Sequence, residues 1–447
     1  MMPQIEQSIR IEHEGELKSK EKTYRTALIV SLVWIILSLP ILGSSDTVVF
    51  ETPIDSYSYL VWVEGSTYYC KNGSSGTVTS SSNASAVINN AWGNMSNGGR
   101  IFVKGTIDLG TSGLVFNLTK YTADLELIGE GETGTVFTYS GSDYAITVTT
   151  GDAAVGYYYA WLEGFAVSGG SKTTGRNGIK IEKVGRNIYL DRIQVTDLDV
   201  GLYIYNTNMV FVNDFKAVSC NTGIKMEGGS TSAANGIWVS NFFLVDNTNY
   251  GVYSKIGVGA NMQKFGHGNI GSCGTGIYAE LAWNLAIEDV YFEYQTLSDI
   301  NASGNDWVYP ITLLKVEKCY FSSTTDYAII LGYTRDVHIA DCFSKNHNTA
   351  FINPRADTTV GIVLQNNHVE DPTVMSPSKL AENSGSWTGT SPVTVAHGCA
   401  GEPDYVFIGV NGAQPYATGY TKNATHIVIY HNAAGSLSGS WKAEYKP

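Results

Sequence analysis

Five short segments of the chain repeat one arrangement of side chains that can do chemistry. Each begins with glycine and alternates apolar residues with lysine, glutamate or tyrosine, as in Gly178-Ile179-Lys180-Ile181-Glu182. Alternate residues of a β-strand point to the same face, so the polar residues would form two columns on one surface. The first column holds Lys180, Tyr203, Lys225, Tyr253 and Tyr278, and the second holds Glu182, Tyr205, Glu227, Lys255 and Glu280.

These residue types suit chemistry on polysaccharides. If the segments stack about 4.8 Å apart, Glu182 and Glu227 lie two coils apart and roughly 10 Å from each other at the backbone. Glu227 and Glu280 repeat that spacing. Carboxyl groups about 6.5–9.5 Å apart suit an inverting glycosidase, in which one protonates the leaving oxygen and the other activates water. Alternatively, Lys225 or Lys255 would abstract the proton α to a uronate carboxyl in a lyase.

The same stripe also suits sugar binding without catalysis. Tyrosine rings stack against sugar rings, and Arg355 is placed to dock a carboxylate near the end of the stripe. Exposed strands also use lysine, glutamate and tyrosine as ordinary solvated ladders with charge pairs between coils. The candidate catalytic residues are Glu182, Glu227, Glu280, Lys225 and Lys255, and the candidate substrate-binding residues are Tyr203, Tyr205, Tyr253, Tyr278, Lys180 and Arg355.

An internal repeat supplies the elements that would position these columns. The pattern apolar-x-apolar-x-x-apolar-x-apolar, first seen as Ile188, Leu190, Ile193 and Val195, recurs seven times before residue 370, each recurrence 22 to 29 residues after the last. It predicts two strands that meet at a two-residue corner, and the glycine-initiated segment supplies a third strand to each coil. The glycine is expected to occupy a turn that needs positive φ. Together they predict an all-β chain whose core is a parallel β-helix.

On these residues the chain resembles the pectin-lyase-like superfamily of right-handed parallel β-helices, over about residues 56–375. A capping helix is expected around Ala84 to Met95, before the strand Gly98–Gly105. The resemblance implies that a substrate groove runs along the outward face of the glycine-initiated sheet. Calcium sites in this superfamily come from clustered aspartates, which the groove lacks, so no metal and no cofactor is expected.

One motif echoes the polygalacturonase members of that superfamily but falls in the wrong register. Gly266-His267-Gly268-Asn269-Ile270-Gly271-Ser272 resembles their signature, yet their catalytic aspartates and histidine stand before the glycine-initiated strand, where this chain has other residues. His267 instead falls in a polar coil with Met262, Lys264 and Asn269. Because those side chains cannot all face an apolar core, we expect a bulge that turns Phe265 and Ile270 inward.

The six cysteines show no metal-ligand spacing. Cys319 and Cys342 would stack on consecutive coils, either within reach of a disulfide or as reduced core residues. Cys220 and Cys273 would occupy equivalent turns two coils apart, too far to pair.

The N-terminal region predicts export. Residues 1–26 form a charged tail with Lys18, Lys20, Lys22 and Arg25 at its end, and residues 27–43 are apolar and uncharged, so the tail is expected in the cytoplasm and the remainder outside the cell. The segment would be an uncleaved membrane anchor or a signal peptide. Six Asn-x-Ser/Thr sequons, including Asn301, fit a secreted or cell-surface glycoprotein. A net charge of −13 argues against nucleic acid as a partner.

The last part of the chain, residues 385–447, is rich in serine and glycine and alternates polar with apolar residues. It predicts a small β-sandwich-like module, similar to modules appended to viral and archaeal β-helix proteins. Capping the open end of the β-helix (residues 56–380) is one role for it, and sugar binding or oligomerisation is another. Outward aromatic stripes, such as Tyr189 with Trp238 and Tyr291 with Phe343, would bind glycans or neighbouring copies in a homotrimer.

Two functions therefore follow from the sequence. The first is an extracellular polysaccharide-binding protein that also degrades its ligand, as a lyase or an inverting hydrolase. The second is a non-catalytic adhesin or structural glycan-binding protein of the cell surface that uses the same stripe.

Overall fold

The computed structural model describes residues 57–95, 98–120, 124–150, 156–229, 234–255, 261–304, 310–355, 359–374, 380–399, 402–403, 405–411 and 418–444. The predicted tail (1–26) and apolar segment (27–43) lie outside these ranges. Within them, no helix is long and apolar enough to cross a membrane.

A small cap precedes the β-helix, as predicted. Helix α2 (Ala84–Gly93) begins at Asn83, whose side chain accepts a hydrogen bond from the backbone N–H of Ala86. Its apolar face, with Ile88 and Trp92, is buried, and the Trp92 ring meets Phe116 edge-on at 5.7 Å. The other elements of this region are β1 (Tyr59–Glu64), β2 (Thr67–Asn72), β3 (Val78–Ser81) and the 3₁₀ helix η1 (Leu118–Lys120).

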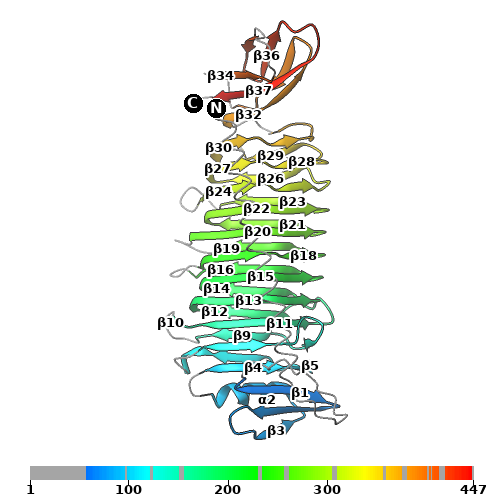
Figure 1. Ribbon diagram of the computed structural model, residues 1–447, viewed down its shortest axis with the longest axis vertical. Helices are drawn as coiled ribbons and strands as arrows, with labels where there is room; N and C mark the ends of the chain where they lie inside the picture. The colour runs from blue at the N-terminus through cyan, green and yellow to red at the C-terminus, as the bar shows by residue number, and fades with distance from the viewer. Residues whose placement is uncertain are drawn as a thin grey trace, which may run out of the picture. The chain divides into compact units, whose positions relative to one another are not determined.

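The glycine-initiated strands form one continuous parallel sheet, here called the groove sheet (Figure 1). Its strands pair in chain order, each with the strands of the coils before and after it, so residues one coil apart lie side by side. The strands are β6 (Leu114–Asn117), β9 (Tyr144–Thr149), β12 (Asn177–Glu182), β14 (Val200–Tyr205), β16 (Thr222–Glu227), β19 (Tyr250–Lys255), β21 (Thr275–Leu281), β23 (Ser298–Ser303), β26 (Tyr327–Gly332) and β29 (Ala350–Pro354).

The other two faces meet at a sharp corner in the middle of the apolar repeat. The corner residue has positive φ in successive coils, at 52° for Arg192, 55° for His267 and 54° for Asp289. Strands that span the corner are β11 (Ala160–Ser168), β13 (Val184–Thr196), β15 (Asn208–Val218), β20 (Asn261–Gly271) and β22 (Trp283–Glu293). The face before the corner, here called the first face, also contains β4 (Gly99–Val103), β7 (Leu125–Ile128), β10 (Gly156–Tyr157), β17 (Asn235–Ser240), β24 (Ile311–Glu317), β27 (Thr334–Ala340) and β30 (Thr359–Gln365). The face after the corner, here called the second face, also contains β5 (Gly105–Asp108), β8 (Thr135–Thr138), β18 (Phe243–Val245), β25 (Tyr320–Ser322), β28 (Phe343–Ser344) and β31 (His368–Val369).

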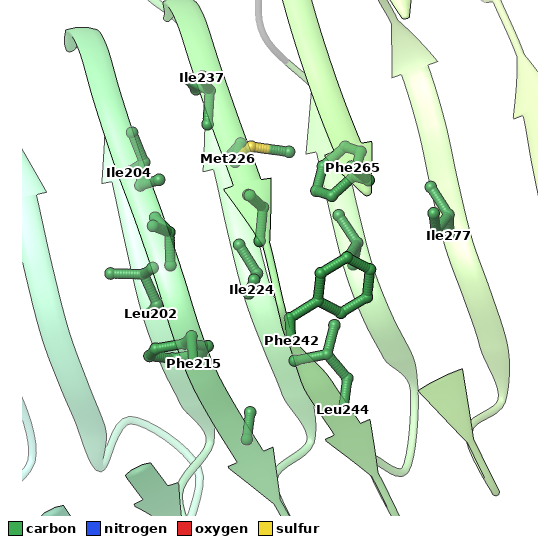
Figure 2. Close-up of a cluster of buried hydrophobic side chains, with 14 of the residues drawn as sticks. Leu202, Ile204, Phe215, Ile224, Met226, Ile237, Phe242, Leu244, Phe265 and Ile277 are labelled. Carbon is green, nitrogen blue, oxygen red and sulfur yellow. The ribbon is translucent and has the colours of Figure 1, made fainter. Parts of the chain in front are cut away.

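The core is the predicted stack of apolar columns. Ile188 pairs with Val210, and Val210 pairs with Ile237, in parallel register on consecutive coils. All three are fully buried. Figure 2 shows Leu202, Phe215, Phe242 and Phe265 among the buried apolar side chains of neighbouring coils. The all-β, right-handed parallel β-helix predicted from the sequence is confirmed.

The polar residues of the coil at positions 262 to 269 are accommodated by the pairing register of β20 (Asn261–Gly271) rather than by a bulge. Gln263 pairs with Ile237, and Phe265 with Val239, so the inward series of this coil starts one residue later than predicted. Phe265 and Ile270 do face inward, as expected, and both are fully buried. The predicted bulge is wrong, because β20 pairs with β17 and β18 without a shift in register.

The recurring glycines are explained by crowding, not by positive φ. None of Gly178, Gly201, Gly223, Gly251 or Gly276 has positive φ. Instead, a Cβ on Gly223 would lie 2.7 Å from the carbonyl oxygen of Gly251 on the next coil, and a Cβ on Gly201 only 2.6 Å from that of Gly223. The predicted role in a left-handed turn is therefore wrong, and close approach between coils is the reason for the glycine.

This crowding gives a stability prediction. Gly223→Ala should lower the free energy of unfolding by about 1–3 kcal/mol, the usual cost of overpacking. Gly266→Ala is the matched control, because a Cβ there would meet nothing closer than 3.5 Å. Denaturation midpoints measure both variants, and equal midpoints would contradict the explanation.

A column of interior side chains ties one coil to the next beside the groove sheet. Asn247 accepts a hydrogen bond from the N–H of Cys220 at 3.0 Å, and Gln295 accepts one from Cys273 at 2.8 Å. Asn247 therefore separates Cys220 from Cys273, which do not pair. Cys319 and Cys342 are buried and form no disulfide, so they are reduced core residues. Burial raises the pKa of the Cys273 thiol to about 11.

Several sequon asparagines have local structural roles. Asn83 caps α2, and the side-chain oxygens of Asn117 and Asn423 accept hydrogen bonds from the N–H groups two residues later, in Thr119 and Thr425. Asx-turns of this kind favour an Asn-x-Ser/Thr sequence without any glycan. Glycosylation stays a prediction.

The C-terminal strands are antiparallel. β37 (Leu437–Glu444) pairs with β32 (Leu380–Gly389) and β34 (Tyr405–Val410), and β36 (His426–His431) pairs with β33 (Val393–Ala396) and β35 (Thr418–Lys422). Trp387 and Trp441 are buried among them. The likeness of this region to viral and archaeal modules, and its capping role, stay predictions.

Candidate functional site

The structure brings the candidate residues together on the outward face of the groove sheet. Lys180 pairs with Tyr203, Tyr203 with Lys225, and the same column continues through Tyr253 to Tyr278. In the second column, Glu182 pairs with Tyr205, Tyr205 with Glu227, and Glu227 with Lys255. The two columns lie where the alternation placed them, but their roles are not tested by this placement.

Glu280 departs slightly from the predicted column. Lys255 pairs with Leu281 rather than Glu280, because the register shifts by one residue between β19 and β21. The Glu280 carboxylate nevertheless accepts hydrogen bonds from Lys255 at 3.1 Å and from the Tyr253 hydroxyl at 3.2 Å.

Each candidate carboxylate is held by a neighbouring lysine. The Nζ–carboxylate distance is 2.9 Å for Lys180 and Glu182 and 3.2 Å for Lys225 and Glu227. Glu227 also accepts a hydrogen bond from the Tyr203 hydroxyl at 2.7 Å. The side chain of Glu280 is only 16% exposed, and those of Glu182 and Glu227 are 22% and 24% exposed. These carboxylates are therefore anchored groups: the pairs of Glu182 and Glu227 lie within one strand, and the pair of Glu280 with Lys255 joins two neighbouring coils.

Lysines and tyrosines alternate along the first column. The Lys225 ammonium lies 5.1 Å from the Tyr203 ring centroid and 5.9 Å from that of Tyr253, which is cation–π distance. Lys180 lies 5.5 Å from the Tyr144 ring, which stacks with Tyr203 at 5.9 Å. The column is a rigid surface in which each charge is matched and each ring is supported.

The tyrosines are hydrogen-bond donors and not bases. Burial raises the pKa of Tyr203, and the hydrogen bond to Glu227 raises it further. Burial likewise raises the pKa of Tyr253, with the charge of Glu280 as the next cause. Both phenols therefore keep their protons at physiological pH and present rings and hydroxyls, not phenolates.

The first column ends in a hollow of about 390 Å³ beside Tyr278. One face of the Tyr278 ring stacks on Tyr253 at 5.6 Å. The next residue in the column is Asn301, whose short side chain leaves the other face of Tyr278 bordering the hollow. Ser298 also lines it, and its buried hydroxyl has no hydrogen-bond partner within the described residues.

Arg355 lies at the far end of the second column. Asn301, Ile330 and Asn353 continue the first column to β29, and Arg355 follows that strand in the row of Ser303 and Gly332. The Arg355 side chain is exposed, and its charge acts to lower the pKa of Tyr278, although burial dominates and the pKa is raised. The predicted end-of-groove position is therefore as expected.

The sequence analysis missed several residues of this surface. Tyr144 and Tyr250 precede the glycine position, and the Tyr250 ring lies 5.3 Å from Tyr253 and 5.4 Å from Tyr278. Ser298 and Asn301 belong to a strand that lacks the glycine. Aligning Tyr144-Ala145-Ile146-Thr147 with Asn177-Gly178-Ile179-Lys180 would have found Tyr144.

The other aromatic stripes offer fewer open ring faces. Tyr189, Phe211 and Trp238 stack on the first face at 5.0 and 4.7 Å, with interplanar angles of 12° and 6°. A ring between two stacked neighbours shows only its edge to solvent. Sugar stacking on such a stripe is therefore confined to its two ends.

No metal cluster lies in the described part of the chain. No group of three or more histidine, cysteine, aspartate or glutamate residues there is close enough to hold an ion.

Comparisons with known proteins show the fold alone. No family model and no curated protein matches the chain. Similar solved structures include the A-module of the mannuronan C-5 epimerase AlgE4 of Azotobacter vinelandii (13% identity, 65% of this chain and 92% of that chain, TM-score 0.45). Others are an endo-xylogalacturonan hydrolase of Aspergillus tubingensis (12%, 71% and 95%, 0.48) and PfbA, a surface adhesin of Streptococcus pneumoniae (10%, 65% and 77%, 0.40). The similar structures are pectin-lyase-like β-helix proteins.

Proposed function

We propose that the protein binds a polysaccharide along the groove sheet, outside the cell. The observation that carries this proposal is the open face of Tyr278 above a hollow lined by an unpartnered buried hydroxyl, at the end of a column of tyrosines and lysines. Carbohydrate sites combine an aromatic face with a few fixed polar groups. Both are present there.

The charges of the groove favour binding over bond cleavage. Lysine and glutamate neutralise each other in the groove, and Nζ of Lys225 lies 3.2 Å from the Glu227 carboxylate. A base that abstracts a proton must first be free of such a partner. The fixed ion pairs instead offer donors and acceptors in a rigid pattern, which suits repeated hydroxyl groups of a glycan chain.

The test is a single substitution at the hollow. Tyr278→Ala should weaken oligosaccharide binding by about ten- to a hundredfold, equivalent to about 1.4–2.8 kcal/mol, because it removes the ring face on which a sugar would stack. Tyr189→Ala is the matched control, since that residue is also an outward, stacked ring but lies on another face. Isothermal titration calorimetry on the full chain measures both, and equal affinities in the two variants would contradict the proposal.

Catalysis is the second candidate, favoured by one observation. Glu182 and Glu227 lie in one column with Tyr205 between them, which puts their backbones about 10 Å apart. Carboxyl groups about 6.5–9.5 Å apart suit an inverting hydrolase. In that case ligand binding would have to separate Glu227 from Lys225 and Tyr203. A non-catalytic adhesin needs no such rearrangement.

The place of action is part of the proposal. Residues 27–43 would anchor the chain in the membrane with the β-helix outside, or would direct its secretion. Deleting residues 1–43 should then leave the expressed chain inside the cell, and unchanged export would contradict this.

Assembly into a homotrimer through outward aromatic stripes also remains a proposal, which analytical ultracentrifugation tests.

A glycan attached at Asn301 would conflict with the groove. Asn301 lies in the sequon Asn301-Ala302-Ser303 and lines the hollow beside Tyr278. Its side-chain oxygen already accepts a hydrogen bond from the Ser303 hydroxyl at 2.6 Å. Binding in the groove therefore requires this sequon to be unmodified.

A further inference from the structure

A second hollow, of about 510 Å³, lies at the corner between the first and second faces, away from the groove sheet. It is centred on residues 266–272, which resemble the polygalacturonase signature but stand at a different position in the coil. Gly268 contributes only backbone to it. The Phe242 ring fills the interior beside that glycine, so a Cβ on Gly268 would lie 2.3 Å from ring atom Cζ. Close packing against the Phe242 ring therefore explains why this position of the motif is a glycine.

One wall of this corner hollow is aromatic. Tyr291, Tyr320 and Phe343 stack in a column with ring centroids 4.8 and 4.9 Å apart. Tyr291 is the end of that stack, because its neighbour on the preceding coil is Asn269. The short Asn269 side chain leaves the outer face of Tyr291 beside the hollow, and the Tyr291 side chain is 37% exposed. This repeats the arrangement of Tyr278 and Asn301 in the groove.

The opposite wall is polar. Nδ1 of His267 lies 2.7 Å from a carboxylate oxygen of Asp289, and both side chains are well exposed, at 67% and 59%. Asp289 thereby fixes the orientation of the imidazole, and Nε2 remains to bond a ligand. Both residues occupy the corner position with positive φ, which turns their side chains outward together.

Two further polar groups in the corner hollow lack a partner. The side-chain oxygen of Asn269 is buried and accepts no hydrogen bond from the described residues. Lys318, the corner residue of the next coil, also lines the hollow and forms no ion pair with any residue that the structure describes. A buried acceptor without a donor costs free energy. The oxygen is closed off from solvent, and a rotation of the Asn269 amide would let a ligand hydroxyl donate to it. A ligand anion would pair with Lys318.

We propose that this corner hollow binds one acidic sugar residue, a uronate of a polysaccharide or glycan. The sugar ring stacks on Tyr291, a hydroxyl donates to Asn269, another bonds Nε2 of His267, and the carboxylate pairs with Lys318. The groove on the other sheet is charge-balanced, with each candidate glutamate paired to a lysine. The unpaired Lys318 makes the corner hollow the site that selects acidic sugars. This second site stands whether or not the groove sheet binds glycan.

The test compares an acidic with a neutral probe on the full chain carrying Tyr278→Ala, which weakens the proposed groove site. Trigalacturonate is expected to bind, and Lys318→Met should lower its affinity at least about tenfold, the loss of about 1.4 kcal/mol. Lys345→Met is the matched control, because Lys345 lies over the same aromatic column, 5.3 Å from the Tyr320 ring, but does not line the hollow. Cellotriose, which carries no charge, should bind weakly and equally to all variants.

Tyr291→Ala provides a second readout. It should abolish trigalacturonate binding while leaving the unfolding midpoint within the range of the Lys345→Met control. Equal trigalacturonate affinity in Lys318→Met and Lys345→Met would overturn the proposal. So would a change of oligomeric state in Tyr291→Ala without a loss of sugar affinity, since the column would then be a contact between copies.

Discussion

Replacing His347 by alanine should lower the free energy of unfolding by about 3–5 kcal/mol, the usual cost of removing one partner from a buried ionic group. His347 is fully buried inside the last coils, with Nε2 2.8 Å from Asp299 and Nδ1 3.2 Å from Asp371. The hydroxyls of Ser323 and Ser344 donate to the same two carboxylates. Without the imidazole, Asp299 would remain in the core with one hydroxyl as its partner.

Denaturant titration at neutral pH measures this effect. The matched control is His338→Ala, because His338 also lies beside an acidic residue, Glu317 at 3.5 Å, but is 37% exposed. Its loss should stay within about 0.5 kcal/mol. The double variant Asp299→Ala/His347→Ala should lose less than the two single variants added together, by about 1–3 kcal/mol. Strict additivity would show that the two residues do not act as a pair.

The same cluster predicts how stability depends on pH. Burial lowers the pKa of His347, but the hydrogen bonds that its ring donates to Asp299 and Asp371, together with the attraction of their negative charges, outweigh burial and raise the pKa to about 9. A raised histidine pKa contributes stability that is complete below the unfolded value, about 6.5, and is lost as the pH rises to the folded value. The free energy of unfolding should therefore fall by about 3 kcal/mol between pH 6.5 and 9.

Below neutral pH, Asp371 and Asp299 have opposite effects on the free energy of unfolding. Burial raises the pKa of Asp371, but hydrogen bonds from His347 and Ser344 outweigh it and hold the pKa below its usual value, so its contribution is lost as the pH falls through that folded value. Burial raises the pKa of Asp299 despite its hydrogen bonds, so protonation of Asp299 favours the folded state. We therefore expect the free energy of unfolding to change little as the pH falls below neutral and to decline clearly as the pH rises above it.

The decline in the free energy of unfolding at alkaline pH is the larger effect and the one to measure. Unfolding free energies at several pH values from 6.5 to 8 should decline in the wild-type chain and stay nearly flat in His347→Ala. This window lies below the ordinary thiol pKa of about 8.5, above which the Cys273 thiol would titrate in the unfolded chain but not in the folded chain, where burial raises its pKa to about 11. A decline of the same size in both chains would assign the pH dependence to other groups.

Most of the fold followed from the sequence because a β-helix repeats its constraints in every coil. Ile188, Val210 and Ile237 each occupy an equivalent inward position, and the spacing between them predicts the pairing that the structure shows. The columns from Lys180 to Tyr278 followed from the same periodicity. Each coil confirms the register of its neighbours, so one misplaced residue does not change the assignment of the rest.

The errors arose where one coil differs from its neighbours. The coil of Phe265 holds its inward residues one position later than predicted, because the polar residues at positions 262 to 269 gave pattern matching no apolar series from which to set the register. The glycine column was assigned the wrong cause, since the closeness of Gly223 to Gly251 on the next coil depends on three-dimensional spacing.

The buried cluster of His347 was not foreseen at all. Its signal was nevertheless present, because Asp299 stands where the series Gly178, Gly201, Gly223, Gly251 and Gly276 would continue. An aspartate at an inward position requires a partner. The partner, His347, comes from two coils further along the chain, and Asp371, which bonds His347 from the other side, comes from three coils further, where nothing local distinguishes either from surface residues.

The central claim, that the groove sheet binds polysaccharide, is tested most directly by incubating the full chain with a panel of uronate and neutral polysaccharides. Bound glycan, new reducing ends and absorbance of unsaturated products are read together. The account predicts bound glycan that is lost in Tyr278→Ala and retained in Tyr189→Ala. New ends lost in Glu227→Gln would add hydrolysis, and absorbance lost in Lys225→Ala would add lyase activity. Absence of binding to every polysaccharide, in a folded chain, would contradict the account.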